Sequence, residues 1–251
     1  MTDTISADEL AGSLDIGAGM LIALVGGGGK TTLGHQLVRS LGPSSVLTTT
    51  TRMGARQTGG LDVIDLSTDA LPDRVHNPTM IHAGLRDRKA RGVTPQWCDE
   101  QMAAALCDTM IVEADGARHR PFKAPADHEP VIPSSSDLVV SVIGADALGR
   151  VIADNCFRPL RVAAVAGVSP WQRLSPAIAA DVLCSDRGGG RNVPRGARRH
   201  VVVTKVPAPD DDSAQRDLVD ELAARLTGRL DVTLVEWHQP ADMAGLDPHP
   251  L

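Results

Sequence analysis

Aromatic residues are scarce in this sequence, which has two Phe, three Trp and no Tyr among its 251 residues. Surfaces that bind single-stranded nucleic acids stack bases on aromatic side chains, and nucleic-acid binders usually carry a basic excess. The formal net charge here is −6. Both features argue against a nucleic-acid-binding role, and they leave Val, Leu, Ile and Ala to build the core.

Cysteine is also rare, and long apolar runs are missing. Cys98, Cys107, Cys156 and Cys184 form no C-x-x-C motif, so neither a disulfide framework nor a structural zinc site is expected. No apolar run approaches the roughly 20 residues that span a bilayer. The N-terminus lacks a basic segment followed by an apolar core, the pattern of a secretion signal. We therefore expect a soluble, cytoplasmic protein that does not bind membranes.

Short apolar runs alternate with predicted helices along the chain. The runs cover residues 20–25, 45–49, 61–66, 109–115, 137–146, 200–206 and 231–237, and the predicted helices cover 31–42, 94–106, 175–183 and 213–228. Runs of Val, Ile and Leu without polar alternation predict strands buried on both faces of a parallel sheet. The pattern predicts a doubly wound, mainly parallel α/β fold in a single domain over 1–251. A small helical and loop-rich subdomain is expected over about 150–195.

The stretch VGGGGKTT, residues 25–32, links the first long apolar run to a predicted helix. Four consecutive glycines are costly to order, which suggests that something approaches this backbone closely. The lysine and threonines that follow predict a phosphate-binding loop. Its amides would face β- and γ-phosphate oxygens, Lys30 would supply positive charge and Thr31 would bind Mg²⁺. The predicted nucleotide-binding residues in this stretch are Gly26, Gly27, Gly28, Gly29, Lys30, Thr31 and Thr32.

Two positions depart from known phosphate-loop patterns. Leu24 stands where G-x-x-x-x-G-K-[ST] has its first glycine. The loop resembles the shorter K-G-G-x-G-K-[ST] form of the ParA/MinD-type ATPases, although Val25 replaces the additional lysine of that form. A mechanism that needs this lysine in a partner subunit is therefore in doubt, and homodimerisation stays open.

Two carboxylates close the apolar run at 109–115. Glu113 and Asp115 are two residues apart, so both face the same side if the strand persists. Acids at the carboxyl edge of a parallel sheet lie where α/β proteins bind ligands. Lys30, Glu113 and Asp115 are the predicted catalytic residues, and Thr31, Glu113 and Asp115 are the predicted Mg²⁺ ligands. The alternative is an exposed strand end with solvated charges.

Basic side chains gather in loops that are predicted to lie near this edge. Guanidinium groups pair readily with oxyanions, and histidine titrates near neutral pH, so these residues are predicted to bind an anionic substrate. They are Arg52, Arg118, Arg120, Lys123, His128 and Arg191. A solvated charged surface is the alternative.

A further segment, VVVTKVP at 201–207, resembles the [NT]-K-x-D motif of GTP-binding proteins. Thr204 and Lys205 fit the motif, and we predict that both contribute to nucleotide binding. Pro207 occupies the place of the aspartate that reads guanine. Guanine specificity therefore loses its main support. ATP or GTP is expected as the nucleotide, and the base preference among ATP, GTP and CTP stays open.

Several segments taken together closely resemble the YqeC-type family of accessory proteins for selenium-dependent molybdenum hydroxylases. They are VGGGGKTT, LTTTTRM, VEADGARHRPFKAPADHEPVIP, IGADALGR and GGGRNVPRGARRHVVVTK, and they extend from about residue 20 to residue 206. The resemblance implies a phosphate-loop nucleotide-binding fold and a protein client, either a molybdenum hydroxylase or a partner in the maturation of its cofactor.

We expect a slow Mg²⁺-dependent nucleoside triphosphatase that assists this maturation, and two alternatives remain. One is a small-molecule kinase with Asp115 as base and with an anionic acceptor held by the loop at 118–128. The other is a non-catalytic switch or scaffold whose nucleotide state selects a partner protein. A kinase would transfer phosphate to a metabolite and not to water, whereas a switch would turn over very slowly.

Overall fold

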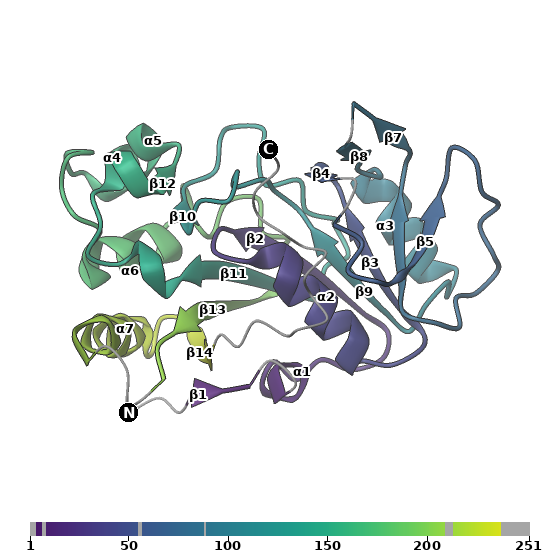
Figure 1. The fold of residues 1–251 in the computed structure, drawn as a ribbon, viewed down its shortest axis with the longest axis horizontal. Coiled ribbons are helices and arrows are strands. Elements are labelled where there is room, and N and C mark those ends of the chain that lie inside the picture. The colour runs from purple at the N-terminus through teal and green to yellow at the C-terminus, as the bar shows by residue number, and fades with distance from the viewer. Residues whose placement is uncertain (1–3, 7–8, 55–56, 88, 209–212, 237–251) are drawn as a thin grey trace.

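A nine-stranded sheet forms the centre of the molecule (Figure 1). The structure is a computed structural model, and it describes residues 4–6, 9–54, 57–87, 89–208 and 213–236. Across the sheet the strands are β1 (Thr4–Ile5), β14 (Asp231–Glu236), β13 (Arg198–Val206), β11 (Leu138–Gly144), β2 (Met20–Gly26), β9 (Thr109–Glu113), β3 (Ser45–Thr49), β6 (Thr79–His82) and β5 (Asp62–Asp65). All of their pairings are parallel. The prediction of a doubly wound, mainly parallel α/β fold is confirmed.

Helices cover both faces of this sheet. On one face, α1 (Leu10–Ser13) and α2 (Lys30–Ser40) pack over alternate residues of β2 such as Ile22 and Leu24. The opposite face is covered by α3 (Pro95–Ala103), α6 (Pro176–Cys184) and α7 (Ser213–Leu226). Both faces are thus buried, which explains the apolar runs without polar alternation. None of the helices in these described ranges has the length and apolar character of a membrane span.

The predicted elements are close to the observed ones, with three kinds of difference. Strands β1 and β6 of this sheet were not predicted, because β1 has only two residues and β6 is a four-residue segment, TMIH, with polar residues at both ends. The strand predicted over 109–115 ends at Glu113. Two small sheets also escaped prediction: the antiparallel β4 (Arg52–Gly54), β8 (Lys89–Arg91) and β7 (Leu85–Arg86), and the parallel pair β10 (Phe122–Lys123) and β12 (Cys156–Phe157).

The helical segment expected over about 150–195 contains α4 (Ile152–Asn155), β12, α5 (Pro159–Ala166) and α6. Helix α6 begins with a proline at its first turn, and the Ser175 hydroxyl accepts a hydrogen bond from the Ile178 amide as an N-cap. Buried residues of this segment, Ile152 and Leu183 among them, belong to the same apolar cluster as Val203 of β13. The segment therefore packs against the main sheet.

The winding direction of the sheet changes at β2. Strands β9 and β3 lie on one side of it, and β11 and β13 lie on the other. In open parallel sheets, ligands bind at the carboxyl ends of the strands beside such a change of direction. The glycine-rich segment after β2 begins at this point.

His35 of α2 is fully buried beside the segment that follows β4. Its Nε2 donates a hydrogen bond to the Gln57 carbonyl at 2.9 Å, whereas its Nδ1 has no partner in the described part of the chain. Burial lowers the pKa of His35 from 6.5 to about 4; the hydrogen bond to Gln57 opposes this shift and the charge of Arg39 adds to it. The imidazole is therefore neutral in the folded protein near neutral pH.

We predict that His35 makes folding sensitive to acid between about pH 6.5 and pH 4. In this window the unfolded chain takes up a proton that the folded chain does not, so the free energy of unfolding falls as the pH falls. The loss attributable to His35 should reach about 3 kcal/mol. Urea unfolding from pH 7.5 to pH 4.5 should show a shallower pH dependence for His35→Gln than for wild type. The exposed His76 provides a control, and His76→Gln should follow wild type. Equal slopes for His35→Gln and wild type would contradict the assignment.

Candidate functional site

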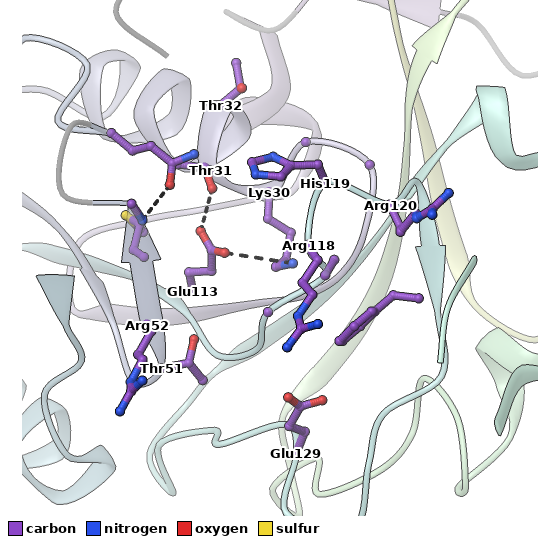
Figure 2. Close-up of a pocket in the computed structure, with 18 of the residues that line it drawn as sticks. Lys30, Thr31, Thr32, Thr51, Arg52, Glu113, Arg118, His119, Arg120 and Glu129 are labelled. Carbon is purple, nitrogen blue, oxygen red and sulfur yellow. Dashed lines mark hydrogen bonds and ion pairs between the residues drawn. The ribbon is translucent and has the colours of Figure 1, made fainter. Parts of the chain in front are cut away.

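A cavity of about 690 Å³ opens at the carboxyl edge of the sheet (Figure 2). One wall is the start of α2 with the glycines before it, and Glu113 at the end of β9 forms the floor. Loop 116–120, Phe157 and Arg158 form a second wall. The segment 51–54, with Gln57 and Lys89, forms a third, and Lys205 follows β13. Elements that are far apart in the sequence therefore meet around one space.

Lys30 and Thr31 approach the acid at the end of β9. The Thr31 hydroxyl donates a hydrogen bond to Glu113 Oε2 at 2.8 Å. Lys30 Nζ donates to the Gly26 carbonyl at 2.6 Å and lies 3.9 Å from Glu113 Oε1. Dashed lines in Figure 2 mark the contacts of Glu113 with Thr31 and with Lys30. The predicted group of a lysine, a threonine and a glutamate is therefore brought together.

The charges of this group shift one another's pKa values. Burial raises the pKa of Glu113, although Lys30 and the Thr31 hydroxyl act in the opposite direction. Burial alone would lower the pKa of Lys30, but the carboxylates of Asp115 and Glu113 outweigh it, so the net shift is upward. Lys30 is therefore a stable cation at the base of the cavity.

Asp115 lies behind the glycine-rich loop and does not line the cavity as described. Both of its carboxylate oxygens accept from the Gly26 amide at 3.1 Å. Oδ1 also lies 3.1 Å from Lys30 Nζ, and Oδ2 lies 3.1 Å from Lys123 Nζ. Because β9 ends at Glu113, the two acids do not present their side chains to the same space. With 2% of its surface exposed, Asp115 orients the loop, and the kinase hypothesis loses its proposed base.

The glycine-rich loop is held by backbone groups on its inner side. The Gly27 amide donates to the Val142 carbonyl at 2.9 Å, and the Gly28 amide donates to the Arg120 carbonyl at 3.1 Å. We expected these two amides to face a ligand, and in this conformation they face the protein. The next four amides, at residues 29–32, have no acceptor among the described residues. They are the unsatisfied donors that begin every α-helix.

Lys123 holds Asp115 in place and is closed off from the cavity. Its Nζ donates to the Gly116 carbonyl at 2.7 Å and to Glu129 Oε2 at 2.8 Å, in addition to its contact with Asp115. Glu129 Oε1 in turn lies 3.1 Å from Arg158 Nη2. Burial raises the pKa of Glu129, but Lys123 and Arg158 outweigh it and the net shift is downward. In this conformation all three donors of Lys123 are taken, so none is available to the anion that the sequence assigned to it.

The other predicted residues divide between the cavity and its surroundings. Arg52, Arg118, Arg120 and Lys205 line the cavity. Thr204 is buried and donates its hydroxyl to the Gly28 carbonyl, so it supports the loop from behind. His128 is exposed, Arg191 donates to the Asp127 carbonyl at 3.1 Å, and neither belongs to the lining as described.

Sequence reasoning missed several residues of the lining. Phe157 and Arg158 join the lining through the pairing of β12 with β10, and Lys89 joins it through the antiparallel pairing of β8 with β4. These contacts join segments more than 30 residues apart, and no local pattern marks them. The scarcity of phenylalanine was the one available signal, because Phe157 is one of only two in the chain.

The cysteines belong to the packing and not to a reactive site. Burial raises the pKa of Cys98, Cys107 and Cys156 to about 12 in each case. Thiols with such pKa values are protonated and unreactive near neutral pH. Across the part of the chain that the structure describes, no cluster of three or more His, Cys, Asp or Glu side chains is arranged to hold a metal ion.

The fold and the site define a doubly wound α/β protein whose glycine-rich loop faces a polar cavity at the carboxyl edge of the sheet. A family model described as YqeC protein matches residues 22–160. The chain is also 31% identical over 227 residues to "Uncharacterized protein YqeC" of Escherichia coli (strain K12), covering 86% of this chain and 88% of that protein. The chain belongs to the YqeC family, as the sequence motifs predicted.

The close contacts of the glycine-rich loop lead to a stability prediction. Gly28 has φ +72°, and a Cβ built there would lie 2.1 Å from the Gly144 backbone nitrogen. Gly28→Ala should therefore lower the free energy of unfolding by about 2 kcal/mol or more, and the Tm by about 4–8 °C. Thermal unfolding followed by circular dichroism would measure the change.

Gly12→Ala is the matched control for this experiment. Gly12 lies in α1, and a Cβ there meets no atom within 4 Å. This substitution should leave the Tm unchanged or raise it slightly, because alanine favours the helix. Equal melting temperatures for Gly28→Ala and Gly12→Ala would show that the loop does not need the bare backbone.

Proposed function

We propose that this protein binds a Mg²⁺–nucleoside triphosphate, with its phosphates on the glycine-rich loop, and hydrolyses it slowly. The observation that carries the proposal is the convergence of Lys30, Thr31 and Glu113 beside four unsatisfied amides at the start of α2. Helix N-termini attract anions through such amides and through the helix dipole. Lys30 adds a buried positive charge at the same place.

The donor set beside Lys30 suits Mg²⁺. Thr31 and Glu113 offer a hydroxyl and a carboxylate oxygen 2.8 Å apart. Magnesium prefers oxygen ligands and is usually bound by one or two protein groups together with substrate phosphates and water. Thr31 and Glu113 would hold the ion, and it would neutralise phosphate charge when bound.

Hydrolysis would depend mainly on electrostatic positioning. Lys30 now donates to the Gly26 carbonyl, and on binding it would turn its ammonium group to the phosphates. Asp115 would then keep Lys123 as its counter-ion, so the buried carboxylate would not be left unpaired. Fixed charges of this kind contribute most of the catalysis in phosphoryl transfer.

The nucleotide would be ATP or GTP, with its adenine or guanine base on the Lys205 side of the cavity. Lys205 pairs with Asp146 at 2.8 Å, and position 207 offers no carboxylate. Resemblance to accessory proteins of selenium-dependent molybdenum hydroxylases supports the further proposal that the nucleotide cycle serves the maturation of such an enzyme. That client would bind with an affinity that changes with the nucleotide state.

Lys30→Met should abolish most nucleotide binding. The substitution keeps the apolar stem and removes the charge, and a hydrogen bond to a charged group contributes about 1.5–3 kcal/mol, or roughly 10–100-fold in Kd. Calorimetric titration of ATP and GTP with Mg²⁺ would measure the loss. Arg225→Gln, on the exposed face of α7, is the control and should match wild type. Equal affinity in Lys30→Met and wild type would refute the phosphate-binding role of the loop.

Glu113→Gln should separate binding from hydrolysis. An amide keeps the shape and can still contact Thr31, but it holds Mg²⁺ poorly and carries no charge. We expect hydrolysis to fall by about 10²–10³-fold, with nucleotide affinity reduced much less. Release of inorganic phosphate under saturating nucleotide would give the rate, with Glu221→Gln on α7 as control. A variant that hydrolyses at the wild-type rate would remove Glu113 from the catalytic group.

A further inference from the structure

The cavity extends across the carboxyl ends of five neighbouring strands. From Lys205 to Thr51 it follows the order β13, β11, β2, β9 and β3, with the glycine-rich loop in the middle. Four strand spacings of about 4.8 Å give a width of about 19 Å. A nucleotide whose phosphates occupy the central loop can extend to one side only. The inference below rests on the proposed nucleotide site, and it concerns the other side.

The two sides of the loop differ in how their charges are balanced. On the β13 side, Lys205 is paired with Asp146. On the β3 side, Arg52 and Lys89 line the cavity from the antiparallel strands β4 and β8. Neither has a carboxylate within 4 Å among the residues that the structure describes. Uncompensated cations facing a shared cavity favour an anionic ligand.

Arg118 completes this group from the facing wall. Its guanidinium lies 5.6 Å from the centre of the Phe157 ring, and it forms no ion pair within the described ranges. The same ring has Arg158 at 4.8 Å and Lys123 at 5.4 Å, so its faces are already used by cations. Phe157 therefore serves to hold Arg118, through a cation–π contact, and not to stack a ligand.

The backbone around Arg118 is held in an uncommon conformation. Arg118 has φ +48° and His119 has φ +61°, in the left-handed region that is costly for residues other than glycine. Such conformations cluster where a side chain must be aimed at a ligand. Figure 2 shows Arg118 on the side of His119 and Arg120, with Arg52 on the β4 side of the same cavity.

We infer that Arg52, Lys89 and Arg118 bind a second ligand beside the nucleotide, a small molecule that carries phosphate or carboxylate groups. The second ligand would lie between the paired strands β4 and β8 and loop 116–120, next to Glu113 and the end of the triphosphate. These three cations have no ion-pair partner among the described residues, and they provide its charge recognition. The cavity thus holds two anionic molecules side by side, with Mg²⁺ and Lys30 serving the nucleotide.

The test first saturates the protein with Mg²⁺ and a non-hydrolysable ATP or GTP analogue and then titrates a second anion by calorimetry. Pyrophosphate and citrate are the two probes, and they distinguish a phosphate ligand from a carboxylate ligand. At least one should bind the nucleotide-loaded wild type. Arg118→Gln and Arg52→Gln should each weaken that probe by about tenfold or more, and by a larger factor than they weaken the nucleotide. Arg225→Gln should bind both as wild type does.

Three results would overturn this inference, and they differ in what they leave standing. If neither probe binds the loaded wild type, the second ligand is ruled out and the nucleotide site stands. If the two arginine variants lose nucleotide affinity as strongly as probe affinity, these cations belong to the nucleotide site itself. A wild type that binds no nucleotide in the first step would refute the proposed function together with the inference. Circular dichroism of each variant confirms that an observed loss does not come from unfolding.

Discussion

Asp115 is the group on which the rest of the site depends. Its carboxylate accepts a hydrogen bond from the Gly26 amide. It lies between two buried lysines, Lys30 on the loop side and Lys123 on the opposite side. A single buried charge without partners would cost several kcal/mol. The alternation of cations and anions from Lys30 through Glu129 to Arg158 avoids that cost. It also fixes the glycine-rich loop relative to β9 and loop 116–120.

The glycines have two tasks that the sequence does not separate. On the inner side, Gly27 and Gly28 permit backbone contacts with Arg120 and Gly144 that a Cβ would block. On the outer side, Gly29 has φ +112° and starts α2 with its first amides unsatisfied. Close packing of protein against protein therefore accounts for half of the glycine run, and the proposed phosphate site accounts for the rest.

The cations around the cavity also fall into two groups, those paired inside the protein and those on the rim. Lys30, Lys123 and Arg158 are neutralised internally and give the site its shape. Of the cations on the rim, Lys205 pairs with Asp146, whereas Arg52 and Arg118 have no ion-pair partner in the described structure. Internal pairing makes a rigid frame, and unpaired rim charges supply long-range attraction for anions. One cavity can therefore combine a fixed loop with a second, adaptable recognition surface.

The sequence by itself determined seven of the nine strands of the sheet, the four longest helices, the loop and the family, because each depends on local periodicity or on a contiguous motif. It also predicted that Lys30, Thr31 and Glu113 lie close together, since parallel strands end at a common edge. Only the tertiary structure decided which of two acids faces the cavity and that Lys123 is enclosed. It also decided that Phe157 and Lys89 join the lining. Those outcomes depend on where β9 ends and on pairings between distant short strands, which no local pattern encodes.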